Sequence, residues 1–203
     1  MPRSLIAFDE GLARDFDGRM AGIDEAGRGP LAGPVVAAAV IFFRKNNLSR
    51  LNDSKKLMPK TREFLFREIA AQAIVGIGTV DEKQIDEINI YQATRLAMKR
   101  AVLALSRTPD LLLIDGNIKL DLPLTQQAIV KGDQKSAAIA AASIIAKVFR
   151  DACMNQLDLL YPQYGFKDHK GYATPGHLTS LQKEGPSPVH RKSFAPVRDL
   201  LAV

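Results

Sequence analysis

Residues 23–34 read Ile-Asp-Glu-Ala-Gly-Arg-Gly-Pro-Leu-Ala-Gly-Pro. Two adjacent carboxylates, Asp24 and Glu25, end a short apolar run, and a loop rich in glycine and proline that carries Arg28 follows them. Side chains alternate between the faces of a strand, but a carboxylate at the strand end can swing back to its neighbour's side. A carboxylate pair beside exposed backbone N–H groups and a fixed cation suits Mg²⁺ or Mn²⁺ and a phosphate oxygen. An acidic turn after a buried strand is the alternative.

The same stretch organises the first part of the fold. It joins two strand-like runs through a loop too short for a crossover, so these strands should pair antiparallel. Periodicity predicts strands at 21–24, 35–43, 74–80, 111–115 and 128–131. It predicts helices at 60–72, 81–88, 90–105 and 136–160, the last of them capped by Ser136. This interleaving predicts an α/β fold whose mixed sheet is flanked by helices.

The chain divides into three parts by composition. Residues 1–19 form a leader that looks loose, and residues 20–160 form the expected catalytic domain. Proline, histidine and basic residues concentrate in residues 161–203, which predicts a small helical and basic C-terminal extension.

Composition limits the possible functions. With 203 residues, a net charge of +6 and a pI near 9.5, the chain should fold as one globular domain with a polyanionic partner. Cys153 is the only cysteine, which excludes an intramolecular disulfide and a cysteine-based zinc site and fits a reducing compartment. Residues 1–20 lack a signal-peptide pattern, and the longest apolar run, 31–43, is too short to span a bilayer. We therefore expect a cytoplasmic protein with no membrane partner.

Two nucleotide-binding motifs are absent from the sequence. Gly27, Gly29 and Gly33 have a spacing one residue longer than the dinucleotide fingerprint, and a strand-like run rather than a helix follows them. No phosphate-binding loop of the form G-x-x-x-x-G-K-[ST] occurs.

Two further acids are expected at the same edge of the sheet. Asp115 ends an apolar strand before Gly116, and Asp133 stands between a strand and the long helix that follows. Each could be ordinary turn or capping chemistry, but ends of adjacent strands are where α/β folds gather functional groups. With Asp24 and Glu25 they make four acids, whose charge two divalent cations would balance. Such a pair of cations activates water and stabilises the leaving oxygen of a phosphodiester.

Six motifs closely resemble those of the ribonuclease HII family: residues 23–34, 52–57, 114–117, 131–133, 141–151 and 169–172. The resemblance runs in order from about residue 20 to Val197. It implies a ribonuclease H-like fold that cleaves RNA in RNA–DNA hybrids and cuts on the 5′ side of a single ribonucleotide embedded in duplex DNA. We expect metal-ion catalysis to leave 3′-hydroxyl and 5′-phosphate ends.

The resemblance also implies a role for particular residues. It implies metal ligands at Asp24, Glu25 and Asp115, with Asp133 completing the acidic site, and Mn²⁺ or Mg²⁺ as the cofactor. It implies that Gly27, Arg28 and Gly29 read the ribose 2′-hydroxyl and that Tyr172 stacks beneath the following sugar. From their charge we expect Lys55 and Lys56 to contact phosphates.

Two other functions compete with this interpretation. A non-catalytic basic module could bind hybrids, although four acids would repel phosphate unless metal ions neutralised them. Another nuclease of the same fold, such as a resolvase or a type-3 ribonuclease H, is the second alternative. The Gly-Arg-Gly loop favours type 2, as does the lack of room for an N-terminal substrate-binding domain.

One short motif points to a protein partner. Residues 156–160, Gln-Leu-Asp-Leu-Leu, resemble the peptide by which bacterial repair enzymes bind the replication sliding clamp. They fall in a helix whose leucines should face the core, so we do not expect clamp binding. We expect the enzyme to act as a monomer.

Overall fold

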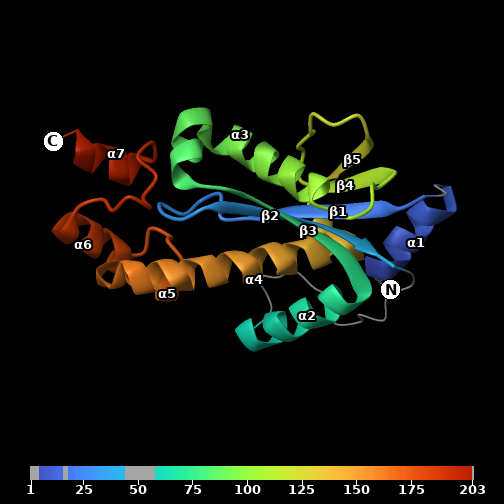
Figure 1. The fold of residues 1–203 in the computed structure, drawn as a ribbon, viewed down its shortest axis with the longest axis horizontal. Coiled ribbons are helices and arrows are strands. Elements are labelled where there is room, and N and C mark those ends of the chain that lie inside the picture. Colours follow the sequence, from blue (N-terminus) through green and yellow to red (C-terminus); the bar gives the residue numbers. More distant parts are fainter. Residues whose placement is uncertain (1–4, 16–17, 44–57, 203) are drawn as a thin grey trace.

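A five-stranded mixed sheet with the strand order β3-β2-β1-β4-β5 forms the centre of the protein (Figure 1). β1 (Met20–Ala26) pairs antiparallel with β2 (Val35–Phe42) and parallel with β4 (Leu111–Asp115). β2 pairs antiparallel with β3 (Ala73–Val80), and β4 pairs parallel with β5 (Thr125–Ile129). The expected mixed sheet is therefore confirmed. This computed structural model describes residues 5–15, 18–43 and 58–202.

Helices cover both faces of the sheet (Figure 1). α3 (Glu82–Leu103) packs on β3 and β2, and α4 (Ala137–Leu160) packs on the other face against β1 and β2, with α2 (Pro59–Gln72) beside it. The Ser136 side chain caps α4 by accepting a hydrogen bond from the Ile139 N–H, as the sequence predicts. α4 lies close to the sheet because Gly22 has no Cβ, and a Cβ there would overlap the backbone of α4.

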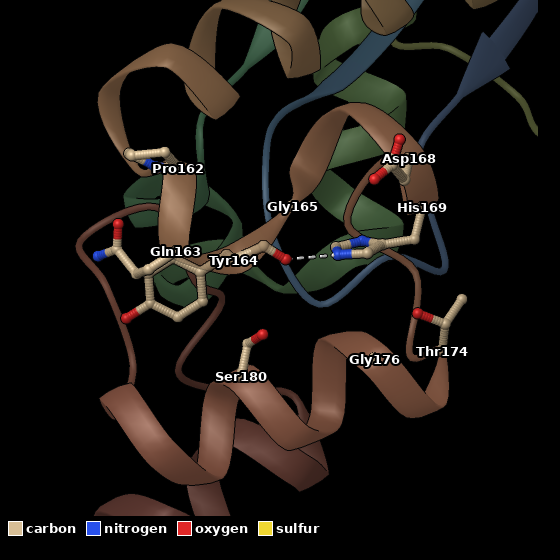
Figure 2. Close-up of a pocket in the computed structure, with 9 residues that line it drawn as sticks. All are labelled: Pro162, Gln163, Tyr164, Gly165, Asp168, His169, Thr174, Gly176 and Ser180. Atoms are coloured by element: carbon tan, nitrogen blue, oxygen red, sulfur yellow. Dashed lines mark hydrogen bonds between the residues drawn. The ribbon is translucent and has the colours of Figure 1, made fainter.

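Residues after 160 form a helical extension at one end of the sheet (Figure 1). It consists of η3 (Pro162–Tyr164), α5 (Phe166–His169), α6 (Pro175–Glu184) and α7 (Ala195–Leu201). η3, α5 and α6 line a shallow, open cavity of about 540 Å³, in which the His169 ring lies 2.8 Å from the Tyr164 carbonyl oxygen (Figure 2). The helical character of the extension is as predicted, and the division of the chain at residue 160 stays a prediction.

The backbone of the extension bonds to the loop between β1 and β2. Leu31 N–H donates to the Gly171 carbonyl at 2.8 Å, and Gly33 N–H donates to the Val189 carbonyl at 3.0 Å. In the other direction, Arg191 N–H donates to the Leu31 carbonyl at 2.8 Å. Backbone hydrogen bonds in both directions therefore attach the extension to this loop.

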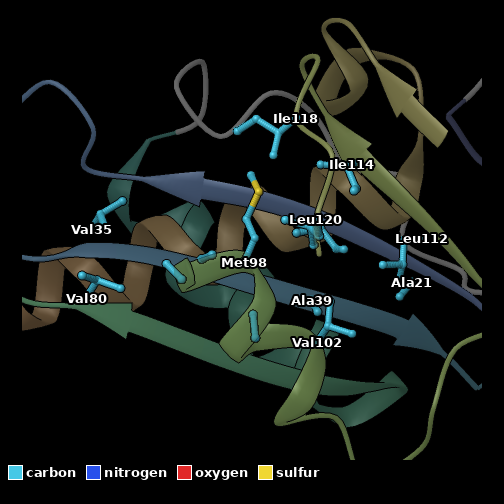
Figure 3. Close-up of a cluster of buried hydrophobic side chains, with 14 of the residues drawn as sticks. Ala21, Val35, Ala39, Val80, Met98, Val102, Leu112, Ile114, Ile118 and Leu120 are labelled. Carbon is cyan, nitrogen blue, oxygen red and sulfur yellow. The ribbon is translucent and has the colours of Figure 1, made fainter. Parts of the chain in front are cut away.

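Alternate residues of β2 supply the cores on the two sides of the sheet. Ala37 and Ala39 pack with Met98 of α3 in the cluster of Figure 3, whereas Ala38 packs against α4. Both faces of β2 are buried, which explains why its sequence is an almost unbroken apolar run.

Two details of the expected secondary structure need refinement. The helices expected at 81–88 and 90–105 are one element, α3, with a kink at Asn89, whose φ is 65°. The Asn89 side chain accepts the N–H groups of Tyr91 and Gln92 and so restarts the helix. The last strand lies at Thr125–Ile129 instead of 128–131. Lys131, with φ 55°, already belongs to the turn that follows.

The prediction of a loose leader is wrong for residues 5–15, which form α1 (Leu5–Asp15). Phe8 and Leu12 of this helix pack against a cluster that includes Ile139 of α4. The Asp9 carboxylate accepts a hydrogen bond from the Ala138 N–H at 2.9 Å, which places its charge at the positive end of α4. No helix in the described ranges is long and apolar enough to cross a membrane.

Candidate active site

A cleft of about 390 Å³ opens at the edge of the sheet where β1 and β4 end. All four predicted acids line it: Asp24, Glu25, Asp115 and Asp133. The Gly27–Arg28–Gly29 loop and Tyr172 line the same cleft. The structure therefore brings together groups that lie far apart in the sequence.

Asp24 and Asp115 stand side by side because their strands are parallel neighbours. Ile23 pairs with Ile114, and both isoleucines pack on the α3 side. The next residue of each strand, Asp24 or Asp115, therefore faces α4, since side chains alternate along a strand. This geometry gives a carboxylate pair at the carboxyl ends of two neighbouring inner strands.

Glu25 reaches the cleft although strand alternation would direct it to the opposite face. It lies at the end of β1, where the chain leaves the sheet, and its Oε1 is 3.3 Å from Nη1 of Arg28. Arg28 thus supplies the positive charge nearest to Glu25, with almost half of its own side chain exposed.

Asp133 comes to the cleft through η2 (Gly132–Gln134), the short helix before α4. The Asp133 side chain is buried at 8% exposure. Asp115 Oδ1 accepts a hydrogen bond from the Gly132 N–H at 2.6 Å, which ties the end of β4 to η2.

The cleft disfavours negative charge unless a cation is present. Burial raises the pKa of Asp24 well above its usual range, and the negative charges of Glu25 and Asp115 raise it further. A hydrogen bond from Ser143 opposes this shift but does not cancel it. Burial also raises the pKa of Glu25, although Arg28 opposes that shift. A divalent cation would relieve this repulsion.

The chemistry of the donors fits a hard divalent cation, because every acid in the cleft offers carboxylate oxygens. In the described part of the chain, however, no three Asp, Glu, His or Cys side chains are grouped closely enough to hold an ion. Glu25 is turned toward Arg28, and Asp115 Oδ1 is engaged with Gly132. The backbone thus brings the acids to one cleft, and their side chains would have to draw closer together to hold an ion.

Tyr172 lies beside the glycine loop in the wall of the cleft. A Cβ atom built on Gly29 would be 3.8 Å from Cε1 of Tyr172, and the tyrosine is 46% exposed. Gly27 has a φ of 95°, which L side chains rarely adopt, so the turn requires glycine there. Lys55 and Lys56, the other two predicted substrate contacts, lie outside the described residues.

Three residues of α4 line the cleft but were given no role by the sequence: Ser143, Lys147 and Arg150. Their spacing of four and then three residues places them on one face of the helix, which was the available signal. Ser143 bonds to Asp24, and Lys147 pairs with Asp151 at 2.6 Å.

The fold and the acidic cleft define a nuclease of the ribonuclease H-like class. The structure is similar to ribonuclease H2 from Pyrococcus horikoshii, with a TM-score of 0.77 and 29% identity over 90% of this chain and 96% of that one. It is also similar to the ribonuclease HII of Archaeoglobus fulgidus solved in complex with PCNA, with a TM-score of 0.74, 30% identity and coverage of 87% and 95%. Bst-RNase HIII, solved in complex with Mn²⁺, shares the fold at a TM-score of 0.68 and 20% identity, with coverage of 91% and 69%.

Sequence comparison narrows the class to one family. The ribonuclease HII family model matches residues 21–197. Ribonuclease HII of Geobacillus kaustophilus is 58% identical over 184 residues, which cover 90% of this chain and 70% of that protein. The chain belongs to the ribonuclease HII family and is a metal-dependent endonuclease that cleaves RNA in RNA–DNA hybrids.

Proposed function

We propose that Asp24, Glu25 and Asp115 hold the catalytic cation, Mg²⁺ or Mn²⁺, and that Asp133 completes a site for two cations when substrate is bound. The observation that carries this proposal is the meeting of four carboxylates from β1, β4 and η2 in one cleft. When bound, such cations supply positive charge to the attacking water and to the leaving oxygen of the phosphodiester.

The protein's own contribution to this chemistry is to fix the acids. The Asp24 carboxylate accepts the N–H of Glu25 at 2.7 Å and a hydrogen bond from Ser143, so its position is set by β1 and α4 together. Asp115 is fixed by Gly132. Glu25 is the adjustable member, because its partner Arg28 is an exposed side chain on the adjoining loop.

We propose that Gly27, Arg28, Gly29 and Tyr172 read the RNA–DNA junction, so that the enzyme cuts on the 5′ side of a single embedded ribonucleotide. Gly29 and Tyr172 support this proposal because they lie near each other in the wall of the cleft, where the exposed backbone and the ring together form a surface on which a sugar can lie. The 2′-hydroxyl is the group that separates RNA from DNA. In-line attack by water should leave 3′-hydroxyl and 5′-phosphate ends.

One comparison of substrates tests both proposals. The enzyme is offered a duplex with one embedded ribonucleotide and a long RNA–DNA hybrid, each with Mg²⁺ or Mn²⁺ and with EDTA. The proposals are supported if the enzyme cleaves both substrates, if EDTA abolishes the cleavage, and if the duplex is cut once, on the 5′ side of the ribonucleotide. A 2′,3′-cyclic phosphate end, detected by mass spectrometry, would show that the 2′-hydroxyl is the nucleophile and refute the proposed chemistry.

We propose the segment at the end of α4 as a candidate surface for a protein partner. Leu159 and Leu160 are 74% and 70% exposed, so the expectation that the leucines here face the core is wrong for these two. Leu157 is partly buried, and Asp158 is buried and accepts the N–H of Lys167. Exposure favours docking to a sliding clamp, whereas the helical state of this segment opposes binding as an extended peptide. Loss of clamp binding by a Leu159→Ala/Leu160→Ala variant in a pull-down would support the docking proposal.

We also propose that the enzyme is a cytoplasmic monomer that removes ribonucleotides from DNA. The free thiol of Cys153 fits a reducing compartment. Light scattering of the purified protein tests the oligomeric state.

A further inference from the structure

Two arginines are buried directly behind the glycine loop. Arg150 of α4 is 1% exposed, and Arg191, just before α7, is 0% exposed. Neither forms a salt bridge with any carboxylate in the described ranges. Glu82 and Asp86 attract Arg191 only from a distance. Burial of a charge without a direct counterion is costly, so this pair calls for a specific explanation.

Arg191 donates all of its hydrogen bonds to carbonyl oxygens of the loop. Its Nη2 donates to Gly27 at 2.6 Å and to Gly33 at 2.7 Å, its Nη1 to Arg28 at 2.9 Å, and its Nε to Gly33 at 3.0 Å. The planar fork of guanidinium is suited to several acceptors at once. Arg191 therefore fixes both ends of the loop.

Arg150 holds the same loop from α4. Its Nε donates to the Pro34 carbonyl at 3.0 Å, and its Nη2 donates to the Ala32 carbonyl at 3.2 Å. Its Nη1 donates to the Lys170 carbonyl at 3.0 Å, two residues before Tyr172. One guanidinium thus joins the glycine loop to the segment that carries the stacking tyrosine.

These bonds determine which way the loop's amides point. In a trans peptide the C=O and the following N–H point in opposite directions, and no peptide bond here is cis. Because the carbonyls of Gly27 and Arg28 point inward to Arg191, the N–H groups of Arg28 and Gly29 point outward. Neither N–H donates to a described residue.

We infer that Arg150 and Arg191 are positioning residues for ribonucleotide recognition. They turn the loop's N–H groups toward the cleft, and their buried charge makes that face attractive to sugar and phosphate oxygens. This inference rests on the proposed reading of the ribose by the glycine loop. Burial, with repulsion from Arg150, lowers the pKa of Arg191 to about 9, so the side chain stays charged at neutral pH.

The first test separates charge from geometry with Arg191→Lys in the full-length protein. Lysine keeps the charge but loses the planar fork. Arg95→Lys is the matched control, because Arg95 also donates to a backbone carbonyl, that of Lys119, but lies on α3 away from the cleft. Binding to a duplex with one embedded ribonucleotide and to the all-DNA duplex of the same sequence is measured in EDTA. KM and kcat are measured with Mn²⁺.

The expected result is a loss of discrimination. Arg191→Lys should weaken binding to the ribonucleotide duplex and raise KM by roughly 10- to 100-fold, as for the loss of a charge-assisted hydrogen bond. Binding to all-DNA duplex and binding of Mn²⁺ should change little, and Arg95→Lys should match the wild type. A folded Arg191→Lys enzyme with wild-type discrimination would overturn the inference.

The second measurement needs no variant. Hydrogen exchange of the wild-type amides of Arg28 and Gly29 should be fast in the free protein and slowed by the ribonucleotide duplex more than by the all-DNA duplex. Protection of both amides in the free protein would overturn the inference, because they would then point inward. If Gly29→Ala leaves discrimination intact, the proposed reading by the loop fails. If Gly29→Ala abolishes discrimination and Arg191→Lys does not, only the role of the arginines fails.

Discussion

Asp115 Oδ1 accepts the backbone N–H of Gly132 at 2.6 Å, so the carboxylate that ends β4 also anchors the segment that carries Asp133. One hydrogen bond therefore sets the spacing of two acids that lie on different elements. An amide oxygen can accept the same bond. Asparagine at position 115 should thus preserve the fold while it removes the charge.

The first prediction follows from this separation of charge and structure. Asp115→Asn and Asp24→Asn should lose detectable cleavage of an RNA–DNA hybrid and bind Mn²⁺ more weakly by calorimetry. Without metal they should stay folded, with a melting temperature equal to or above that of the wild type, because a charge that the cleft disfavours is gone. Hybrid binding without metal should be unchanged or tighter, because a repulsive charge is gone. Asp121→Asn is the control, since its side chain is 89% exposed and pairs with Lys99 away from the cleft. Near-normal turnover by either cleft variant in Mg²⁺ would refute the assignment.

The second prediction concerns Tyr172. Tyr172→Ala should reduce cleavage at a single embedded ribonucleotide by roughly 10- to 100-fold, because a stacked aromatic contact is worth about 1–3 kcal/mol. Binding of Mn²⁺ should not change. Tyr91→Ala is a matched control, because Tyr91 on α3 is 44% exposed against 46% for Tyr172. Equal rates for the two variants would make Tyr172 an ordinary surface residue.

The third prediction distinguishes two glycines of the same loop. Gly29→Ala should leave stability unchanged, because its Cβ meets only Tyr172 at 3.8 Å, yet it should impair cleavage by crowding the sugar. Gly27→Ala should destabilise the protein by about 1–3 kcal/mol or more, since its φ of 95° is unfavourable for alanine and its Cβ would overlap Arg150. Urea unfolding and single-ribonucleotide cleavage measure both effects. Equal losses of stability in the two variants would contradict this distinction between Gly27 and Gly29.

The fourth prediction uses a buried histidine pair in the extension. His190 Nδ1 accepts the Ser187 N–H at 3.0 Å, so neutral His190 carries its proton on Nε2, which lies 3.0 Å from Nε2 of His177. His177 then carries its proton on Nδ1 and donates to the Tyr172 carbonyl at 2.9 Å. Burial, with repulsion from His177, lowers the pKa of His190 to about 4. Both rings must be neutral for this chain of bonds.

The pH dependence follows from that pKa. The unfolded chain takes up the proton near pH 6.5 and the folded protein only near pH 4, so stability is lost as the pH falls through this window. The loss is on the order of 3 kcal/mol for one histidine. Urea unfolding between pH 7 and pH 4 should show a smaller loss for His190→Asn than for the wild type, although the variant should be less stable at pH 7. If the free energy of unfolding falls equally with pH in the two proteins, His190 is excluded as the source of the pH dependence.

Local patterns in the sequence were sufficient for the strands that bear Asp24, Glu25 and Asp115 and for the start of α4. An apolar run that ends in a carboxylate placed β1 and β4, and a serine before an alanine-rich helix placed the start of α4. The family motifs then named Asp24, Glu25 and Asp115 before any contact was known. These signals suffice because strand alternation and helix capping depend on residues near each other in the chain.

Other features depended on contacts between residues far apart in the sequence. Leu5, Phe8 and Leu12 have the i, i+3, i+7 spacing of an amphipathic helix, but only packing on α4 and the bond from Ala138 to Asp9 place α1 in the fold.

Gly29 lies near Tyr172, and Arg191 bonds to the glycine loop. These contacts join the loop after β1 to the C-terminal extension. By itself, the sequence determined the family, the candidate acids and most of the elements. Only the tertiary structure decided that two buried arginines hold the glycine loop with its N–H groups outward. Such contacts depend on how the extension folds back onto the loop between β1 and β2, which no local pattern encodes.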